Sequence, residues 1–169
     1  MLKKGEANFL VKFLAIFFAL FFLLKIADLD WLLKALAGIE AWLLAQLGVL
    51  ALLDGNEIIL EKTRVLIVPE CSGLFMPILL ASLLWSTRLE NARRLKFMLI
   101  FTPLLFLFNL ARLLVTILPL AFFPALFTPI HVFLWFVDSA LVLWVWMLAQ
   151  GIKLREILGK PHKGMGHAQ

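Results

Sequence analysis

Three residues that together could support acyl transfer lie where apolar segments of this chain begin or end. Cys71 begins one apolar segment, Arg112 lies near the end of a second, and His131 begins a third. A thiol can attack a carbonyl carbon, a guanidinium can stabilise the oxyanion that develops, and an imidazole can transfer protons. The three residues therefore predict a cysteine acyl-transfer site if the fold brings them together.

The neighbours of Cys71 suit a nucleophile. Pro69 favours the first position of a helix, which predicts Cys71 in the first turn, where free N–H groups and the helix dipole favour a thiolate. The backbone N–H groups of Ser72 and Gly73 can contribute to an oxyanion hole. The Glu70 carboxylate opposes the thiolate unless a cation pairs with it. A lone cysteine in an apolar helix is also commonly a small buried hydrophobe, and a single cysteine excludes an internal disulfide and any cysteine-rich metal site.

Asn109 and Arg112 are three residues apart, which places both side chains on one face of a helix. A charged side chain within an apolar span is costly, so it has a partner or a function. Arg112 can also snorkel to lipid headgroups, but the apolar turn 113–118 separates it from the next loop. Asp138 shares a helical face with His131 but lies about 10 Å deeper by helical rise. We therefore expect Asp138 to meet Arg112 or a polar group on another helix.

The composition indicates an integral membrane protein. Hydrophobic residues make up 63% of the 169 residues, with 16 Phe and 6 Trp, and the mean hydropathy is +1.00. These values predict a single all-α membrane domain of four to six helices, because a water-soluble domain of this size cannot keep so much apolar surface from water. The predicted spans are 9–27, 69–85, 97–118 and 131–150. A further apolar helix at 31–53 lies along the membrane, re-enters it or spans it.

The loop charges predict how the chain is oriented. Ten basic and three acidic residues lie in the segments 1–8, 86–96 and 151–169, which the positive-inside rule places in the cytoplasm. The segment 28–70 is acidic and the loop 119–130 has no charge, so both are expected outside. The net charge of +5 thus reflects membrane orientation rather than a nucleic-acid partner. We expect a multi-pass protein of the cytoplasmic membrane with its site at the extracytoplasmic face. It has four crossings, or five with an external N-terminus if 31–53 spans.

A short region before Cys71 has strand character. The segments 57–60 and 64–68 are rich in Ile, Leu and Val, and the turn 54–56 precedes them. They predict a small extracytoplasmic β-hairpin over 54–68. Such a hairpin could bind an extended peptide along its edge or act as a lid over the helices.

The motifs at these positions resemble those of the exosortase/archaeosortase family. The resemblance lies in the segment Pro-Glu-Cys-Ser-Gly-Leu at 69–74, in Asn109 and Arg112, and in His131, and it extends over about 56–146. It implies a transpeptidase-like enzyme that needs no cofactor. Its partner would be an exported protein whose C-terminal signal contains a short motif, a transmembrane helix and a basic cluster.

The resemblance also implies roles for individual residues. Cys71 would attack the peptide carbonyl and form a thioester, Arg112 would stabilise the oxyanion or position the substrate, and His131 would transfer protons. A lipid or surface amine would accept the protein, whereas water as acceptor would make the enzyme a protease. Five further residues are expected to support the site or bind substrate: Glu70, Ser72, Gly73, Asn109 and Asp138.

Two other interpretations fit the same residues. In the first, the protein is a membrane scaffold or export subunit without enzymatic activity, Arg112 and Asp138 form a buried ion pair, and Cys71 is inert. In the second, the protein is an acyltransferase that uses a lipid donor, which keeps the cysteine but changes the substrate. An enzyme requires a reactive thiol that is accessible from outside, whereas a scaffold requires only the ion pair.

Overall fold

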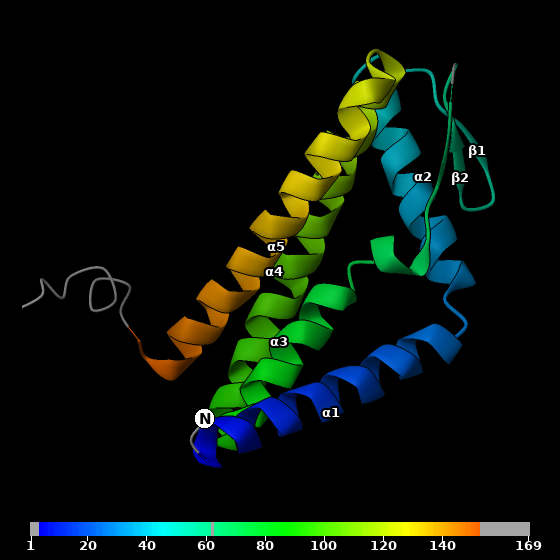
Figure 1. The fold of residues 1–169 in the computed structure, drawn as a ribbon. Helices are drawn as coiled ribbons and strands as arrows, with labels where there is room; N and C mark the ends of the chain where they lie inside the picture. Colours follow the sequence, from blue (N-terminus) through cyan, green and yellow to red (C-terminus); the bar gives the residue numbers. More distant parts are fainter. Residues whose placement is uncertain (1–3, 62, 153–169) are drawn as a thin grey trace, which may run out of the picture.

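The computed structural model describes residues 4–61 and 63–152 of the chain. Within these residues it contains five α-helices and one small antiparallel sheet (Figure 1), which confirms the predicted helical membrane bundle with a short β-element before the cysteine. The helices are α1 (Lys4–Ile26), α2 (Asp30–Gln46), α3 (Phe75–Ser86), α4 (Asn91–Ile117) and α5 (Phe127–Gln150). The strands are β1 (Leu52–Asp54), β2 (Glu57–Ile59) and β3 (Arg64–Leu66). The predicted tail at 151–169 lies largely outside the described residues.

Among the described residues, three helical segments are long and apolar enough to cross a membrane. They are Lys4–Ile26, Asn91–Ala121 and Pro124–Gln150, where the last two include short 3₁₀ turns next to α4 and α5. These segments expose large apolar side chains such as Phe22, Leu107 and Phe136, which would be costly in water. The exposed apolar surface is that of a membrane protein.

The helix predicted at 31–53 is shorter than expected. α2 ends at Gln46 because Gly48 adopts φ +79°, and the N–H of Val49 then donates to the carbonyl of Leu44 at 3.0 Å. This arrangement is typical of a helix that stops at a left-handed glycine. The prediction was therefore wrong at its C-terminal end, and residues 52–54 form a strand that the sequence analysis assigned to a helix and a turn.

The sheet has the strand order β1-β2-β3, with both pairs antiparallel. The predicted hairpin corresponds to β2 and β3, in which Ile58 is opposite Val65, and β1 adds a third strand in which Leu53 is opposite Ile58. Ile58 is fully buried and joins the sheet to the hydrophobic core. The Asn56 side chain donates to the carbonyl of Ile67 at 2.9 Å, which ties the turn before β2 to the segment after β3.

The span predicted at 69–85 is not one continuous helix. Residues Pro69–Cys71 form a 3₁₀ turn, and α3 begins only at Phe75 because Gly73 has φ +78°, a conformation that interrupts a right-handed helix. Cys71 therefore precedes α3 and does not lie in its first turn. α3 has 12 residues, or about 18 Å by helical rise, which is less than the roughly 30 Å of a bilayer hydrocarbon core.

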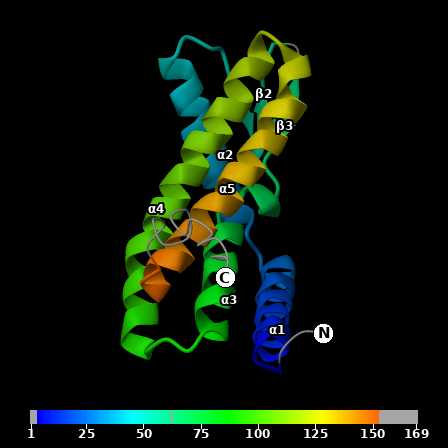
Figure 2. The same cartoon turned by 60° about the vertical axis from the view of Figure 1, so that its left-hand side comes forward.

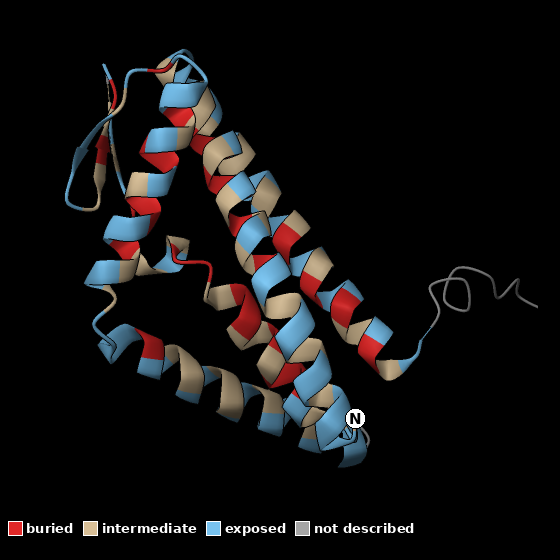
Figure 3. Cartoon of the chain, turned by 180° about the vertical axis from the view of Figure 1, so that it is seen from behind, coloured by how far each residue is buried: buried red, intermediate tan, exposed pale blue. Residues whose placement is uncertain are grey.

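The buried apolar residues form two hydrophobic cores. The first core joins α2 and the sheet to the C-terminal part of α4, and the second joins α3 and α5 to the N-terminal part of α4. In contrast, Leu24 is the one buried residue of α1 (Figure 3). The chain between the sheet and α3, which carries Cys71, runs between α2 and α3 (Figure 1), and Cys71 packs against the first core.

The two ends of the bundle differ in the segments that they contain. The start of α1, the start of α4 and the end of α5 lie at one end, and the loop 118–126 and the sheet lie toward the other (Figures 1 and 2). The rings of Phe9 and Trp146, 6.1 Å apart, join α1 to α5 near the first end. The described parts of the segments that are rich in basic residues thus share one end of the molecule.

Candidate functional site

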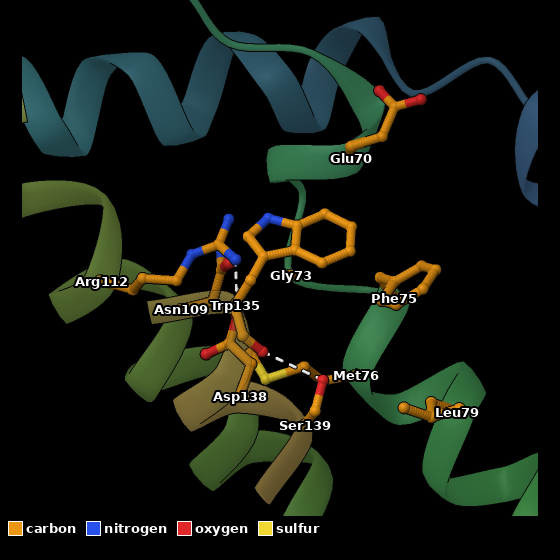
Figure 4. A pocket seen from close by; sticks show the side chains of 10 residues that line it. All are labelled: Glu70, Gly73, Phe75, Met76, Leu79, Asn109, Arg112, Trp135, Asp138 and Ser139. Carbon is orange, nitrogen blue, oxygen red and sulfur yellow. Dashed lines mark hydrogen bonds and ion pairs between the residues drawn. The ribbon is translucent and has the colours of Figure 1, made fainter. Parts of the chain in front are cut away.

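A small cavity lies where the chain before α3 approaches the middle of α4 and α5 (Figure 4). Its volume is about 20 Å³, which is room for one water molecule. Five of the residues that line it are polar: Glu70, Asn109, Arg112, Asp138 and Ser139. The remaining lining residues are Gly73, Phe75, Met76, Leu79 and Trp135.

Arg112 and Asp138 form a buried ion pair on one wall of this cavity. Arg112 Nη1 donates to Asp138 Oδ2 at 2.5 Å, and the two residues are only 6% and 7% exposed. This confirms that Asp138 is a partner of Arg112, as the sequence suggested. Arg112 Nε and Asp138 Oδ1 have no hydrogen-bond partner among the described residues. The pair thus retains one buried donor and one buried acceptor that no described residue satisfies.

Asn109 connects the turn that carries Cys71 to α4. Its Nδ2 donates to the carbonyl oxygen of Cys71 at 2.9 Å, and the Asn109 side chain is almost fully buried. Asn109 and Arg112 are on one helical face, and Cβ atoms three residues apart in a helix are about 5–6 Å from each other. The main chain of Cys71 therefore lies about one helical turn from Arg112.

Cys71 is a half-buried free thiol beside the cavity. Its neighbours Glu70 and Gly73 line the cavity, whereas Cys71 packs against the first hydrophobic core. Ser72 is fully buried, and its Oγ accepts a hydrogen bond from the N–H of Leu74 at 3.3 Å. Cys71 is therefore held through its backbone and its neighbours, with no other cysteine in the chain to pair with.

The Glu70 carboxylate is paired with a cation that the sequence analysis did not identify. Lys25, in the last turn of α1, donates a hydrogen bond to Glu70 Oε1. This hydrogen bond holds the pKa of Glu70 below its usual range. Because a cation pairs with the Glu70 carboxylate, this carboxylate does not oppose a thiolate at Cys71.

His131 lies in the first turns of α5 and borders a second cavity. α5 begins at Phe127, four residues before the predicted start, and the His131 ring stacks on that of Phe127 with centroids 5.4 Å apart. The second cavity has a volume of about 310 Å³ and shares Trp135 and Ser139 with the first. His131 and the ion pair are thus in neighbouring cavities that have one wall in common.

Trp135 and Ser139 are the lining residues that the sequence analysis missed. Trp135 is one of 22 aromatic residues in the chain, so its residue type carried no signal. Ser139 had a weak signal, because it is next to Asp138 in an otherwise apolar stretch. Within the described part of the chain, no group of three or more His, Cys, Asp or Glu residues could hold a metal ion.

Comparison with known proteins places this chain in a family. A family model described as transmembrane exosortase matches residues 4–151, a range that contains Cys71, Arg112 and His131. No curated protein and no solved structure matches the chain. Because the matched range covers most of the 169 residues, the chain belongs to the transmembrane exosortase family.

Proposed function

We propose that this protein is a membrane cysteine transpeptidase that cleaves C-terminal sorting signals of exported proteins and transfers the cleaved proteins to an amine acceptor. Membership of the exosortase family supports a membrane transpeptidase-like role. The observation that carries the proposal is the position of Arg112, a buried cation in a cavity that the residues flanking Cys71 also line. The Arg112 guanidinium, whose Nε has no described partner, is a group of the kind that can stabilise an oxyanion.

The proposed reaction has two stages that use the same residues. The Cys71 thiolate forms a C–S bond to the peptide carbonyl carbon, and the carbonyl electron pair moves to oxygen, where Arg112 stabilises the negative charge. The oxyanion then collapses and the C–N bond breaks. The departing amine takes a proton from the His131 imidazolium, which leaves a thioester on Cys71.

The second stage returns the enzyme to its starting state. The neutral imidazole of His131 accepts a proton from the incoming amine as that amine attacks the thioester carbonyl. The C–S bond breaks and the thiolate of Cys71 is released. A lipid or surface amine gives an anchored product, and water in place of the amine gives hydrolysis.

The arrangement of charge supports an orientation for this chemistry. Described residues of the basic segments, such as Arg93 and Arg94, lie at the end of the bundle that contains the start of α4 (Figure 1). On the positive-inside rule this end faces the cytoplasm. The sheet and the loop 118–126 then face outward in the cytoplasmic membrane. The scissile bond would enter from that side while the transmembrane helix of the signal stays in the bilayer.

A membrane scaffold or export subunit is the alternative, and the buried Arg112–Asp138 pair favours it. An ion pair at 2.5 Å with little exposure can serve structure alone. On this alternative Cys71 is one of the apolar groups packed on the first core.

The two functions differ in what happens when Cys71 is replaced by serine. The experiment co-expresses the protein with a reporter that carries a short motif, an apolar helix and a basic cluster at its C-terminus, and follows cleavage by gel shift. Cys71→Ser should abolish cleavage while the protein remains folded and inserted, because a hydroxyl is nearly isosteric but has no accessible anion at neutral pH. Ser82→Ala is the matched control, since Ser82 is buried in α3 and donates only within its helix, to Ile78 at 2.8 Å. Cleavage by Cys71→Ser at the wild-type rate would support the scaffold.

A further inference from the structure

We propose that Asn109 is a positioning residue that holds the backbone of Cys71 at a fixed position relative to Arg112. The inference rests on the proposed function and adds a residue that acts through Cys71 rather than on the substrate. Its basis is a side chain on α4 that bonds the main chain of a residue 38 positions earlier.

The contact between Asn109 and Cys71 joins α4 to the turn before α3. Asn109 is only 1% exposed, so its bond to the Cys71 carbonyl is largely shielded from bulk water. A shielded carbonyl that loses its donor is unfavourable, which favours the observed arrangement over a displaced turn. The hydrogen bond from Asn109 therefore fixes the position of the 3₁₀ turn Pro69–Cys71 along α4.

Gly73 shows that the chain makes room for this amide. A Cβ atom at Gly73 would lie 3.0 Å from Asn109 Nδ2 and 3.1 Å from its Cγ, closer than side chains normally approach. Gly73 also has φ +78°, which turns the chain between the 3₁₀ turn and α3. Only glycine satisfies both requirements at low cost. Gly73, two residues after Cys71, and Asn109 on α4 thus pack closely against each other and form one unit.

Because the same helix carries Asn109 and Arg112, this unit connects the nucleophile to the cation. α4 is continuous from Asn91 to Ile117, and residues three apart on it keep a constant separation. A fixed Cys71 carbonyl therefore fixes the start of the Cys71 side chain relative to the Arg112 guanidinium. A displacement of about 1 Å between reacting groups can cost on the order of 100-fold in rate.

A matched asparagine elsewhere in the chain provides a control. The Asn56 side chain donates to the carbonyl of Ile67 at 2.9 Å, a part-buried bond from an amide to the main chain like that of Asn109. Asn56 lies before β2 and does not line the cavity. We expect Asn56→Ala to change the processing rate by no more than about threefold.

The test uses the full-length protein in liposomes with the tripartite-tail reporter, the one described above that ends in a short motif, an apolar helix and a basic cluster. It measures kcat and KM for cleavage, and separately the rate at which iodoacetamide alkylates Cys71, the single cysteine. Asn109→Ala should lower kcat roughly 10- to 100-fold and leave KM within about twofold. The alkylation rate should stay within about threefold of wild type, because a small reagent that diffuses freely does not need alignment with Arg112.

Asn109→Asp is the second variant, because it keeps the size of the side chain but replaces the amide donor with an acceptor. It should lose kcat as Asn109→Ala does. In the Asn109→Ala background, Gly73→Ala should cause a smaller further loss than in wild type, since the amide that its Cβ would meet is gone. Normal kcat in both Asn109 variants would overturn the inference. A parallel fall of kcat and rise of alkylation, with a lower melting temperature, would also overturn it by showing a general loosening. Neither result bears on the proposed function, because the role of Cys71 as nucleophile is tested separately with Cys71→Ser.

Discussion

Two buried carboxyl groups, Asp138 and Glu40, are held in different ways in the two halves of the molecule. Asp138 on α5 lies 2.5 Å from the Arg112 guanidinium and borders the site cavity. Glu40 on α2 is fully buried, and neither of its carboxylate oxygens has a hydrogen-bond partner among the described residues. It lies on the same helical face as Leu36, Ala37 and Leu44, which are core residues.

The difference between Asp138 and Glu40 indicates which buried carboxyl group the protein keeps charged and which it keeps largely neutral. A buried ionised carboxylate is stable only with a cation or several donors. Arg112 supplies that cation for Asp138, so the cavity keeps a charged pair. Burial raises the pKa of Glu40, which lies outside the three membrane-spanning segments, to about 7. A large share of Glu40 is therefore neutral at neutral pH. Its carboxyl can stay buried in this form without a cation, so it does not indicate a functional site at α2.

The largest effect should come from breaking the ion pair. Arg112→Met leaves Asp138 buried without its cation, so the free energy of unfolding should fall by about 3–5 kcal/mol. Cleavage of the reporter should also be lost, because the oxyanion loses its donor. Thermal unfolding in detergent measures the first effect and gel shift the second.

A double variant separates the structural role of the pair from its chemical role. Arg112→Met with Asp138→Leu removes both charges, and replacing a buried pair by apolar side chains is often neutral for stability. We expect this variant to be as stable as wild type within about 1 kcal/mol and still inactive. Wild-type cleavage by this stable double variant would show that the pair serves structure alone.

A smaller effect of opposite sign is expected at Glu40. Glu40→Leu removes a buried polar group that has no described partner, so at pH 7 it should stabilise the protein by about 1–3 kcal/mol. Cleavage should remain within about twofold of wild type, since α2 does not contribute to the cavity. A destabilised Glu40→Leu variant would mean that the carboxyl has a structural partner, and the contrast with Asp138 would disappear.

The Glu40 contrast also predicts a dependence on pH. The pKa of Glu40 is about 7 in the folded state, against 4.5 for an unperturbed glutamate such as that in the unfolded chain. Between these values the unfolded chain loses this proton and the folded chain keeps it, so stability falls as pH rises from about 4.5 to 7. Above this window both states are ionised and the contribution is constant. Subtracting the profile of Glu40→Gln from that of wild type should isolate this slope, and identical profiles would contradict it.

The smallest effect should come from the exposed pair of Lys25 and Glu70. Lys25→Met should cost about 0.2–1 kcal/mol at pH 7 and low salt, and the difference should vanish in high salt. The pKa of Glu70 is lowered in the folded state, so this contribution is present above pH 4.5 and is lost as pH falls through the lowered value. Salt-dependent melting curves provide the measurement. A loss that persists in high salt would indicate packing rather than charge.

The sequence predicted features that depend on local pattern and missed those that depend on a single backbone angle or a distant contact. Apolar runs located the helices, and the spacing of Asn109 and Arg112 put both on one face. The boundaries at Gly48 and Gly73 were missed because a positive φ is not visible in an apolar run. The bonds from Lys25 to Glu70 and from Asn109 to Cys71 join residues 45 and 38 positions apart, so they become apparent only once the helices have packed.

The identity of the nucleophile is tested most directly by trapping the acyl-enzyme. Wild-type protein is incubated with the tripartite-tail reporter without an added amine, quenched in acid, and the peptide containing Cys71 is analysed by mass spectrometry. We expect a reporter fragment linked to Cys71 that neutral hydroxylamine removes, as expected for a thioester, and that is missing in Cys71→Ser. Cleaved reporter without any adduct on Cys71, or the same adduct in Cys71→Ser, would contradict the account.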